Sequence, residues 1–170
     1  MRWNRSIAGI ATVLALALGA AACGGGSSSS GSSQAGGTQQ GGGAPGTIGV
    51  AKSSLGDILV DGKGWTLYLF AKDANGKSAC TNSCASAWPP ATVSGTPTVG
   101  GVLDAGMLGT TTRPDGTTQV TYNGHPLYRF SGDAKAGDTK GEGASAFGAA
   151  WYAVSPKGDA VQKKSGGGSY

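Results

Sequence analysis

The sequence predicts a mainly β domain built from two pseudo-symmetric β-hairpin repeats, carried behind an export signal and a flexible tether. The segment "GWTLYLFAKD", residues 64–73, returns as "GHPLYRFSGD", residues 124–133. Turn-forming Gly, Pro, Asn and Asp clusters separate short apolar runs, as expected for hairpins. Nothing shows a helical period over more than about two turns. Together these observations favour one small β domain rather than a helical or α/β protein.

The N-terminus has the layout of a bacterial secretory signal. Arg2 and Arg5 precede the apolar run "SIAGIATVLALALGAAA", which ends next to Cys23. The run is too short to span a bilayer comfortably, since a spanning helix needs about 20 apolar residues. Small residues followed directly by Cys resemble the lipobox of bacterial lipoproteins, although Ala20 stands where Leu is usual. We therefore expect a signal peptide over 1–22 and acyl chains on Cys23 that hold the protein at the membrane.

A low-complexity segment follows the predicted lipid anchor. Residues 24–46, "GGGSSSSGSSQAGGTQQGGGAPG", contain no charge and no large apolar side chain. Such a chain cannot bury enough surface to offset its conformational entropy, and a Gly/Ser coil of this length reaches about 25 Å. We expect a disordered tether over 23–46, a folded domain over 47–164 and a disordered tail over 165–170.

Four hairpin turns are expected within the domain. The sequences "DILVDGKGWTLYLF", "TTTRPDGTTQVTY", "QVTYNGHPLYRF" and "AAWYAVSPKGDAVQ" each place a turn signal between two short runs rich in apolar, aromatic or Thr residues. These turns and the repeated segment give repeats over about 55–90 and 115–159.

The repeated segment contains the pattern Tyr-x-Phe-x-x-Asp. On a strand the Tyr and Phe face the same side, and the Asp then enters a turn-like loop. A Trp follows each copy, 15 residues after the first Asp and 18 after the second. We expect Tyr, Phe and Trp to form the core between two repeats that pack face to face, with each Asp capping its loop. The residues concerned are Tyr68, Phe70, Asp73 and Trp88 in the first repeat, and Tyr128, Phe130, Asp133 and Trp151 in the second.

Two cysteines remain once Cys23 is assigned to lipid. Cys80 and Cys84 lie outside the cytosol, where thiols tend to pair. On an extended strand their Cα atoms would be about 13 Å apart, whereas one helical turn brings them to about 6 Å, within disulfide reach. A disulfide therefore requires a short helical turn near 80–88. The alternative is that Cys80 and Cys84, with His125, bind copper or act as a thiol-redox pair.

Two copies of the Tyr-x-Phe-x-x-Asp pattern, behind a lipobox and with "SACTNSCASAWPP" after the first copy, resemble the bacterial secreted-repeat lipoproteins. That family consists of predicted lipoproteins with a Tyr-x-(Phe/Trp/Tyr)-x-x-Asp motif and no established function. The resemblance covers about residues 55–159. It implies export, lipidation and a tandem repeat, and it supplies no reaction.

Composition and motifs exclude several classes of function. Two of the 13 Lys and Arg residues lie in the predicted signal. The remaining Lys and Arg residues nearly balance the nine Asp and Glu residues, so the mature chain is nearly neutral. It has no basic stripe for nucleic acid. His125 is the single histidine; it falls in a predicted turn where an exposed position is expected, and no nucleophile elbow, phosphate-binding loop or cofactor motif is present. We expect a non-catalytic binding or structural module without a cofactor, held at the extracytoplasmic face of the cell membrane and directed at an envelope partner or a small ligand.

Overall fold

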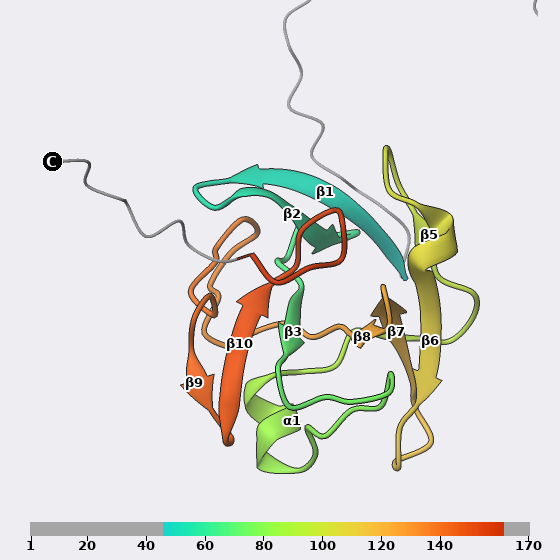
Figure 1. The fold of residues 1–170 in the computed structure, drawn as a ribbon, viewed down its shortest axis with the longest axis vertical. Helices are drawn as coiled ribbons and strands as arrows, with labels where there is room; N and C mark the ends of the chain where they lie inside the picture. The colour runs from blue at the N-terminus through green and yellow to red at the C-terminus, as the bar shows by residue number, and fades with distance from the viewer. Residues whose placement is uncertain (1–45, 162–170) are drawn as a thin grey trace, which may run out of the picture. The chain divides into compact units, whose positions relative to one another are not determined.

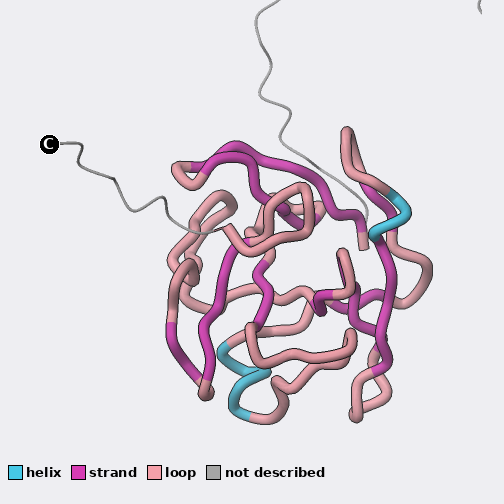
Figure 2. The backbone as a smooth tube through the Cα atoms, viewed as in Figure 1, coloured by secondary structure: helices cyan, strands magenta, loops and turns pink. Residues whose placement is uncertain are grey.

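The computed structural model describes residues 46–161, the part of the chain that carries both repeats (Figure 1). Residues 1–45 and 162–170 lie outside the described residues, and with them the predicted signal, Cys23, nearly all of the tether and the tail. Strands and connecting loops make up most of the described chain, with two short helical segments, so the prediction of a mainly β domain is confirmed (Figure 2). The elements are β1 Thr47–Ser53, β2 Gly56–Asp61, β3 Tyr68–Phe70, α1 Ser83–Ala87, β4 Thr92–Val93, β5 Thr98–Val99, η1 Ala105–Met107, β6 Leu108–Thr112, β7 Thr118–Tyr122, β8 His125–Pro126, β9 Ser145–Ala146 and β10 Ala149–Ala153.

Each repeat begins with an antiparallel hairpin. In the first, β1 pairs with β2 and places Ile48 opposite Asp61; in the second, β6 pairs with β7 and places Leu108 opposite Tyr122. The β6–β7 hairpin and the β7–β8 turn were predicted, whereas β1 was not. Each repeat therefore starts before the predicted positions 55 and 115, because its first strand completes the hairpin.

The glycine that opens the repeated segment has the same conformation in both copies. Gly64 has φ 84° and Gly124 has φ 77°, values that side chains with a Cβ rarely adopt. The turn before the first copy is also closed by Asp61, whose N–H donates to the Trp65 carbonyl at 2.9 Å. The repeated Gly is thus required by the backbone turn.

The two repeats are interlocked through their backbones. Tyr68 and Tyr128 form a mutual pair in which the N–H of each donates to the carbonyl of the other, at 2.8 and 2.9 Å. β3 of the first repeat then pairs with β10 of the second, with Phe70 opposite Trp151. In the second copy the Arg129 N–H donates to the Pro89 carbonyl of the first repeat at 2.8 Å. The motif strand of each repeat therefore pairs with the Trp-bearing segment of the other.

The repeats pack together as one small domain, as expected, and they do so by exchanging strands, which was not predicted. A short motif strand leaves backbone donors and acceptors unpaired at its edges, and burying them unpaired would be costly. Pairing of each motif strand with the other repeat provides hydrogen-bond partners for these backbone groups. Neither repeat closes its own sheet, so the repeats form one domain with a pseudo-two-fold axis between Tyr68 and Tyr128.

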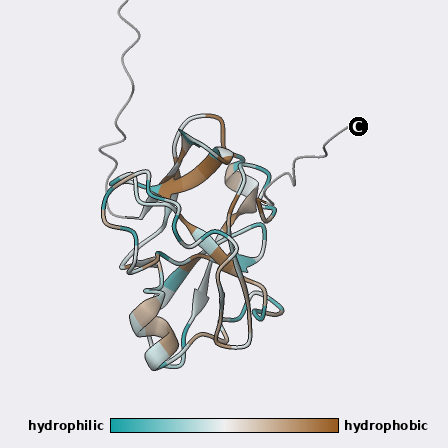
Figure 3. Cartoon of the chain, turned by 90° about the vertical axis from the view of Figure 1, so that its left-hand side faces the viewer, coloured by the Kyte–Doolittle hydropathy of each residue, from teal (hydrophilic) through white to brown (hydrophobic). Residues whose placement is uncertain are grey.

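Side chains of the motif strands alternate between two hydrophobic clusters. Leu67 and Leu69 point into one cluster, and Tyr68 and Phe70 into the other, as the period of two predicts. Hydrophobic and hydrophilic residues are correspondingly interspersed along the chain in Figure 3. The first cluster, which we call the aliphatic cluster, is aliphatic apart from Tyr122 and also includes Ile48, Leu59, Ala91, Val120, Leu127 and Val154. The second is aromatic and includes Cys80, Cys84, Trp88, Tyr128 and Trp151.

Candidate functional site

The motif side chains meet across the pseudo-two-fold axis. The Tyr68 hydroxyl donates to Oδ2 of Asp133 at 2.8 Å, and the Tyr128 hydroxyl donates to Oδ2 of Asp73 at 2.7 Å. Each Tyr thus bonds the Asp of the other repeat, not the Asp five residues along its own chain. We call this arrangement the crossed Tyr–Asp pairs. It explains why the pattern needs both residues in both copies.

The second oxygen of each Asp caps the following loop. Oδ1 of Asp73 accepts from the Ala79 N–H at 2.8 Å, and Oδ1 of Asp133 accepts from the Lys140 N–H at 2.9 Å. The prediction that each Asp caps its loop is therefore confirmed. The second role of each Asp, as partner of a Tyr, was not predicted, since that Tyr lies 55 or 65 residues away in the chain.

The aromatic rings form a continuous stack at the centre of the domain. Trp88 and Trp151 lie parallel, with centroids 3.9 Å apart, and Phe130 and Phe70 stack on their outer faces at 4.3 and 4.1 Å. Tyr68 meets Trp88 edge-on at 5.5 Å, and Tyr128 meets Trp151 edge-on at 5.1 Å. Both edge-to-face and offset-stacked contacts are favoured geometries for aromatic pairs. The predicted aromatic core is confirmed.

Burial sets the ionisation of the crossed pairs. It raises the pKa of both Tyr68 and Tyr128 well above the ordinary range, and the hydrogen bonds to Asp133 and Asp73 raise them further. Burial also raises the pKa of Asp73 and of Asp133, while the Tyr hydroxyl bonds lower it and partly compensate. At neutral pH the hydroxyls are therefore neutral donors, each bonded to a carboxyl group, that of Asp133 buried and that of Asp73 half-buried. They are poorly placed to act on a substrate.

Cys80 and Cys84 form a disulfide, with Cα atoms 5.2 Å apart. Cys84 lies in α1, as the geometry of the predicted helical turn requires. The loop is fixed from the second repeat by the buried Arg113, which donates to the Cys80 carbonyl at 2.7 Å and to Oγ of Ser78 at 2.7 Å. Ser78 in turn lies 2.7 Å from the Tyr128 hydroxyl. The disulfide loop is therefore tied to one of the crossed Tyr–Asp pairs.

The copper and redox alternative needs Cys80 and Cys84 as thiolates. In the disulfide neither sulfur is a thiolate. Within residues 46–161, no group of three or more His, Cys, Asp or Glu side chains could hold a metal ion. His125 begins strand β8, opposite Tyr122, and is half-buried rather than fully exposed in a turn as expected.

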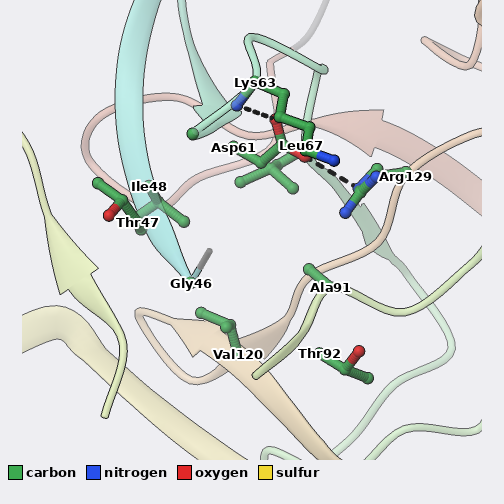
Figure 4. Close-up of a pocket in the computed structure, with 11 residues that line it drawn as sticks. Gly46, Thr47, Ile48, Asp61, Lys63, Leu67, Ala91, Thr92, Val120 and Arg129 are labelled. Atoms are coloured by element: carbon green, nitrogen blue, oxygen red, sulfur yellow. Dashed lines mark hydrogen bonds and ion pairs between the residues drawn. The ribbon is translucent and has the colours of Figure 1, made fainter. Parts of the chain in front are cut away.

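A pocket of about 160 Å³ opens beside the aliphatic cluster, between the start of β1 and the turn after β2 (Figure 4). Ile48, Leu67, Ala91 and Val120 contribute apolar side chains to its wall, and Gly46, Thr47, Asp61, Gly62, Lys63, Thr92 and Arg129 complete the lining. Figure 4 shows Asp61, Lys63 and Arg129 together on one side of the pocket.

The polar side of this pocket carries more positive than negative charge. Nε of Arg129 lies 3.0 Å from Oδ2 of Asp61 in an ion pair. Oδ1 of Asp61 accepts from the backbone N–H of Lys63 and of Trp65 at 2.8 and 3.0 Å. Both oxygens of the single carboxylate are therefore engaged, while two cationic side chains share the rim. Arg129 and Asp61 were not predicted as site residues, although the sequence carries one signal: Arg129 occupies the position that Leu69 has in the first copy.

The fold and the site together define a β protein whose two repeats are joined by a shared motif. A family described as a secreted repeat of unknown function matches residues 49–92 and 109–155, more than half of the chain, and the protein belongs to that family. Both matches begin within the first strand of a repeat, ahead of the predicted starts at 55 and 115. No curated protein and no solved structure matches the chain. Across the described part of the chain, no helix has the length and apolar character needed to cross a membrane.

Proposed function

We propose that the protein is a lipid-anchored module of the cell envelope that binds a partner or small ligand and catalyses no reaction. One observation supports the non-catalytic part: the polar groups of the repeated motif are bonded to one another between the repeats. Tyr68 and Tyr128 are fully buried. The motif is the most distinctive chemistry in this chain, and its groups are used to join the two repeats.

Anchoring follows from the sequence around Cys23 and from membership of a secreted family. The mature protein is expected to begin at Cys23 and to carry more than one acyl chain there. A single acyl chain would bind the membrane only marginally. A tether of about 25 Å would then let the domain reach partners close to the membrane surface.

Mass spectrometry of the protein extracted from its own membrane tests the anchoring. The expected species starts at Cys23, carries acyl chains and contains the Cys80–Cys84 disulfide. A Cys23→Ala variant should leave the membrane fraction, whereas the control Cys84→Ala should remain in it. An unmodified mature chain, or a Cys23→Ala variant that stays bound to the membrane, would contradict lipid anchoring.

The absence of catalysis is tested by incubating the mature protein with a small-molecule extract of the envelope. If the protein is a binding module, the native protein should retain a ligand from the extract and should leave the masses of all compounds in the extract unchanged. Heat-denatured protein is the control, and it should also leave those masses unchanged. A compound that is consumed while a product appears, in the presence of native protein only, would overturn the proposal.

A further inference from the structure

We propose that the pocket lined by Arg129 and Lys63 is a binding site for a small organic anion, a monocarboxylate with an apolar body about the size of a benzene ring. This inference rests on the proposed binding function and names the class of ligand. It is carried by a comparison of the pocket with its pseudo-symmetric counterpart in the same molecule.

Backbone pairing defines the counterpart residue by residue. Ile48 faces Asp61 in the first hairpin as Leu108 faces Tyr122 in the second. The Ala91 N–H donates to the Leu127 carbonyl as the Val154 N–H donates to that of Leu67. The positions equivalent to Asp61, Ala91 and Arg129 are therefore Tyr122, Val154 and Leu69.

The counterpart is a filled part of the core. Tyr122 and Val154 are fully buried, and Leu69 is 5 % exposed. The hydroxyl of Tyr122 donates a hydrogen bond to the Pro156 carbonyl at 3.1 Å. The fold therefore accommodates large apolar side chains at these three positions and does not itself require a pocket.

The pocket exists because one copy differs at these three positions. Ala91 is smaller than Val154, and an ion pair between Asp61 and Arg129 stands at the positions that Tyr122 and Leu69, two members of the aliphatic cluster, hold in the other copy. An ion pair beside the core gains little against well-packed apolar residues. The pair is therefore poorly explained by stability, and a role in binding accounts for it better.

The charge and size of the pocket indicate the ligand. Asp61 already accepts three hydrogen bonds or ionic contacts. The rim keeps an excess positive charge from Lys63 and Arg129, and the planar guanidinium is suited to a carboxylate. A dry cavity of about 150 Å³ accommodates benzene. The pocket volume of about 160 Å³ therefore suits a benzene-sized body, with its charged group at the rim.

Benzoate is the probe, and its neutral analogue benzamide is the control ligand. Titration of the full mature chain, followed by NMR, should give saturable shifts at the pocket for benzoate and affinity at least tenfold lower for benzamide. Raising the salt concentration should weaken benzoate binding, because the rim charges are partly exposed.

Three variants test the residues. Lys63→Gln removes an exposed charge without a risk to folding and should weaken benzoate at least threefold. Arg129→Leu introduces the residue type that Leu69 has in the counterpart and should weaken benzoate binding at least tenfold. Ala91→Leu fills the pocket and should abolish binding. The matched control is Lys157→Leu, an exposed lysine outside the pocket, which should bind like the unmodified protein.

The outcomes separate this inference from the proposed function. Equal binding of benzoate and benzamide would overturn the assignment of an anion. Absence of any binding, or benzoate binding that survives Ala91→Leu and Lys63→Gln, would overturn the site. In each of these cases a lipidated chain that converts no compound in the envelope extract would still support the proposed function.

Discussion

Replacing Tyr68 by Phe tests the crossed Tyr–Asp pairs most directly. The substitution removes one hydroxyl and leaves Asp133, which is 7 % exposed, without its partner from the other repeat. A hydrogen bond to a charged group contributes about 1.5–3 kcal/mol. We therefore expect the free energy of unfolding at pH 7 to fall by about 2 kcal/mol. For a domain of this size that corresponds to a fall in Tm of about 8 °C.

The pH dependence of this loss is a second part of the same prediction. Burial raises the folded-state pKa of Asp133 above its value in the unfolded chain. The protonated carboxyl group therefore favours the folded state at low pH, and this contribution to the free energy of unfolding is lost as the pH rises through the folded-state pKa. The Tyr68 bond offsets part of the loss because it favours the carboxylate. Below the ordinary Asp pKa of about 3.9, Asp133 is protonated, and the variant loses a neutral hydrogen bond of about 1 kcal/mol. The difference between the two proteins should therefore halve between pH 7 and about pH 3.5.

Urea unfolding of both proteins at the two pH values measures this difference. Tyr152→Phe is the matched control, since Tyr152 is half-buried and its hydroxyl makes no hydrogen bond within residues 46–161; it should change stability by less than about 0.5 kcal/mol. If Tyr68→Phe behaved like this control, or if its effect were the same at both pH values, the crossed pairs would not stabilise the fold as argued.

The structure makes three further predictions about stability. Because the pKa of both Tyr68 and Tyr128 is raised, only the unfolded chain loses their protons just above pH 10, so urea melts should show stability falling there by about 1.4 kcal/mol per pH unit for each tyrosine. Replacing Cys80 and Cys84 together by Ala should lower the free energy of unfolding by only about 2 kcal/mol, because the closed loop is short, and thermal melts of the unmodified protein should match those of the variant when reductant is added. Gly141→Ala should cost about 1–3 kcal/mol in the same melts, since a Cβ there would meet two aromatic rings at 2.8 and 2.9 Å.

Each of these predictions has a control or a contradictory outcome. Tyrosinate absorbance showing that every tyrosine of the folded protein titrates with a midpoint near pH 10 would contradict the tyrosine argument. A reductant that leaves melting of the unmodified protein unchanged would show that the disulfide adds no stability. The control for Gly141→Ala is Gly49→Ala, where a Cβ would meet no atom within 4 Å. Similar effects at the two glycines would contradict the packing argument.

Local features of the fold could be predicted from the sequence because they depend on neighbouring residues. The turn at Gly64, the shared face of Tyr68 and Phe70 and the helical turn needed by Cys80 and Cys84 all follow from backbone geometry over a few residues. The loop-capping oxygen of Asp73 belongs to the same category. Each of these predictions is confirmed.

Contacts between distant residues could not be predicted in this way. The sequence shows that Tyr68 and Asp133 are both present, but their separation of 65 residues leaves many possible pairings of equal chemistry. The pocket is a similar case, since Asp61 and Arg129 have ordinary neighbours in sequence and meet only after the repeats exchange strands. Two repeats that carry the same motif can pair within themselves or with each other, and the sequence pattern is the same in both cases.

The sequence by itself determined the repeat, its turns, the alternation of its strands and the disulfide loop. Tertiary structure decided that each motif strand pairs with the other repeat, that each Tyr bonds the other repeat's Asp, and that one copy opens a charged pocket where its counterpart is filled. The physical reason is that turns and strand periodicity are set by backbone geometry over a few residues, whereas strand exchange is chosen by how completely the whole chain buries its rings and satisfies its hydrogen bonds.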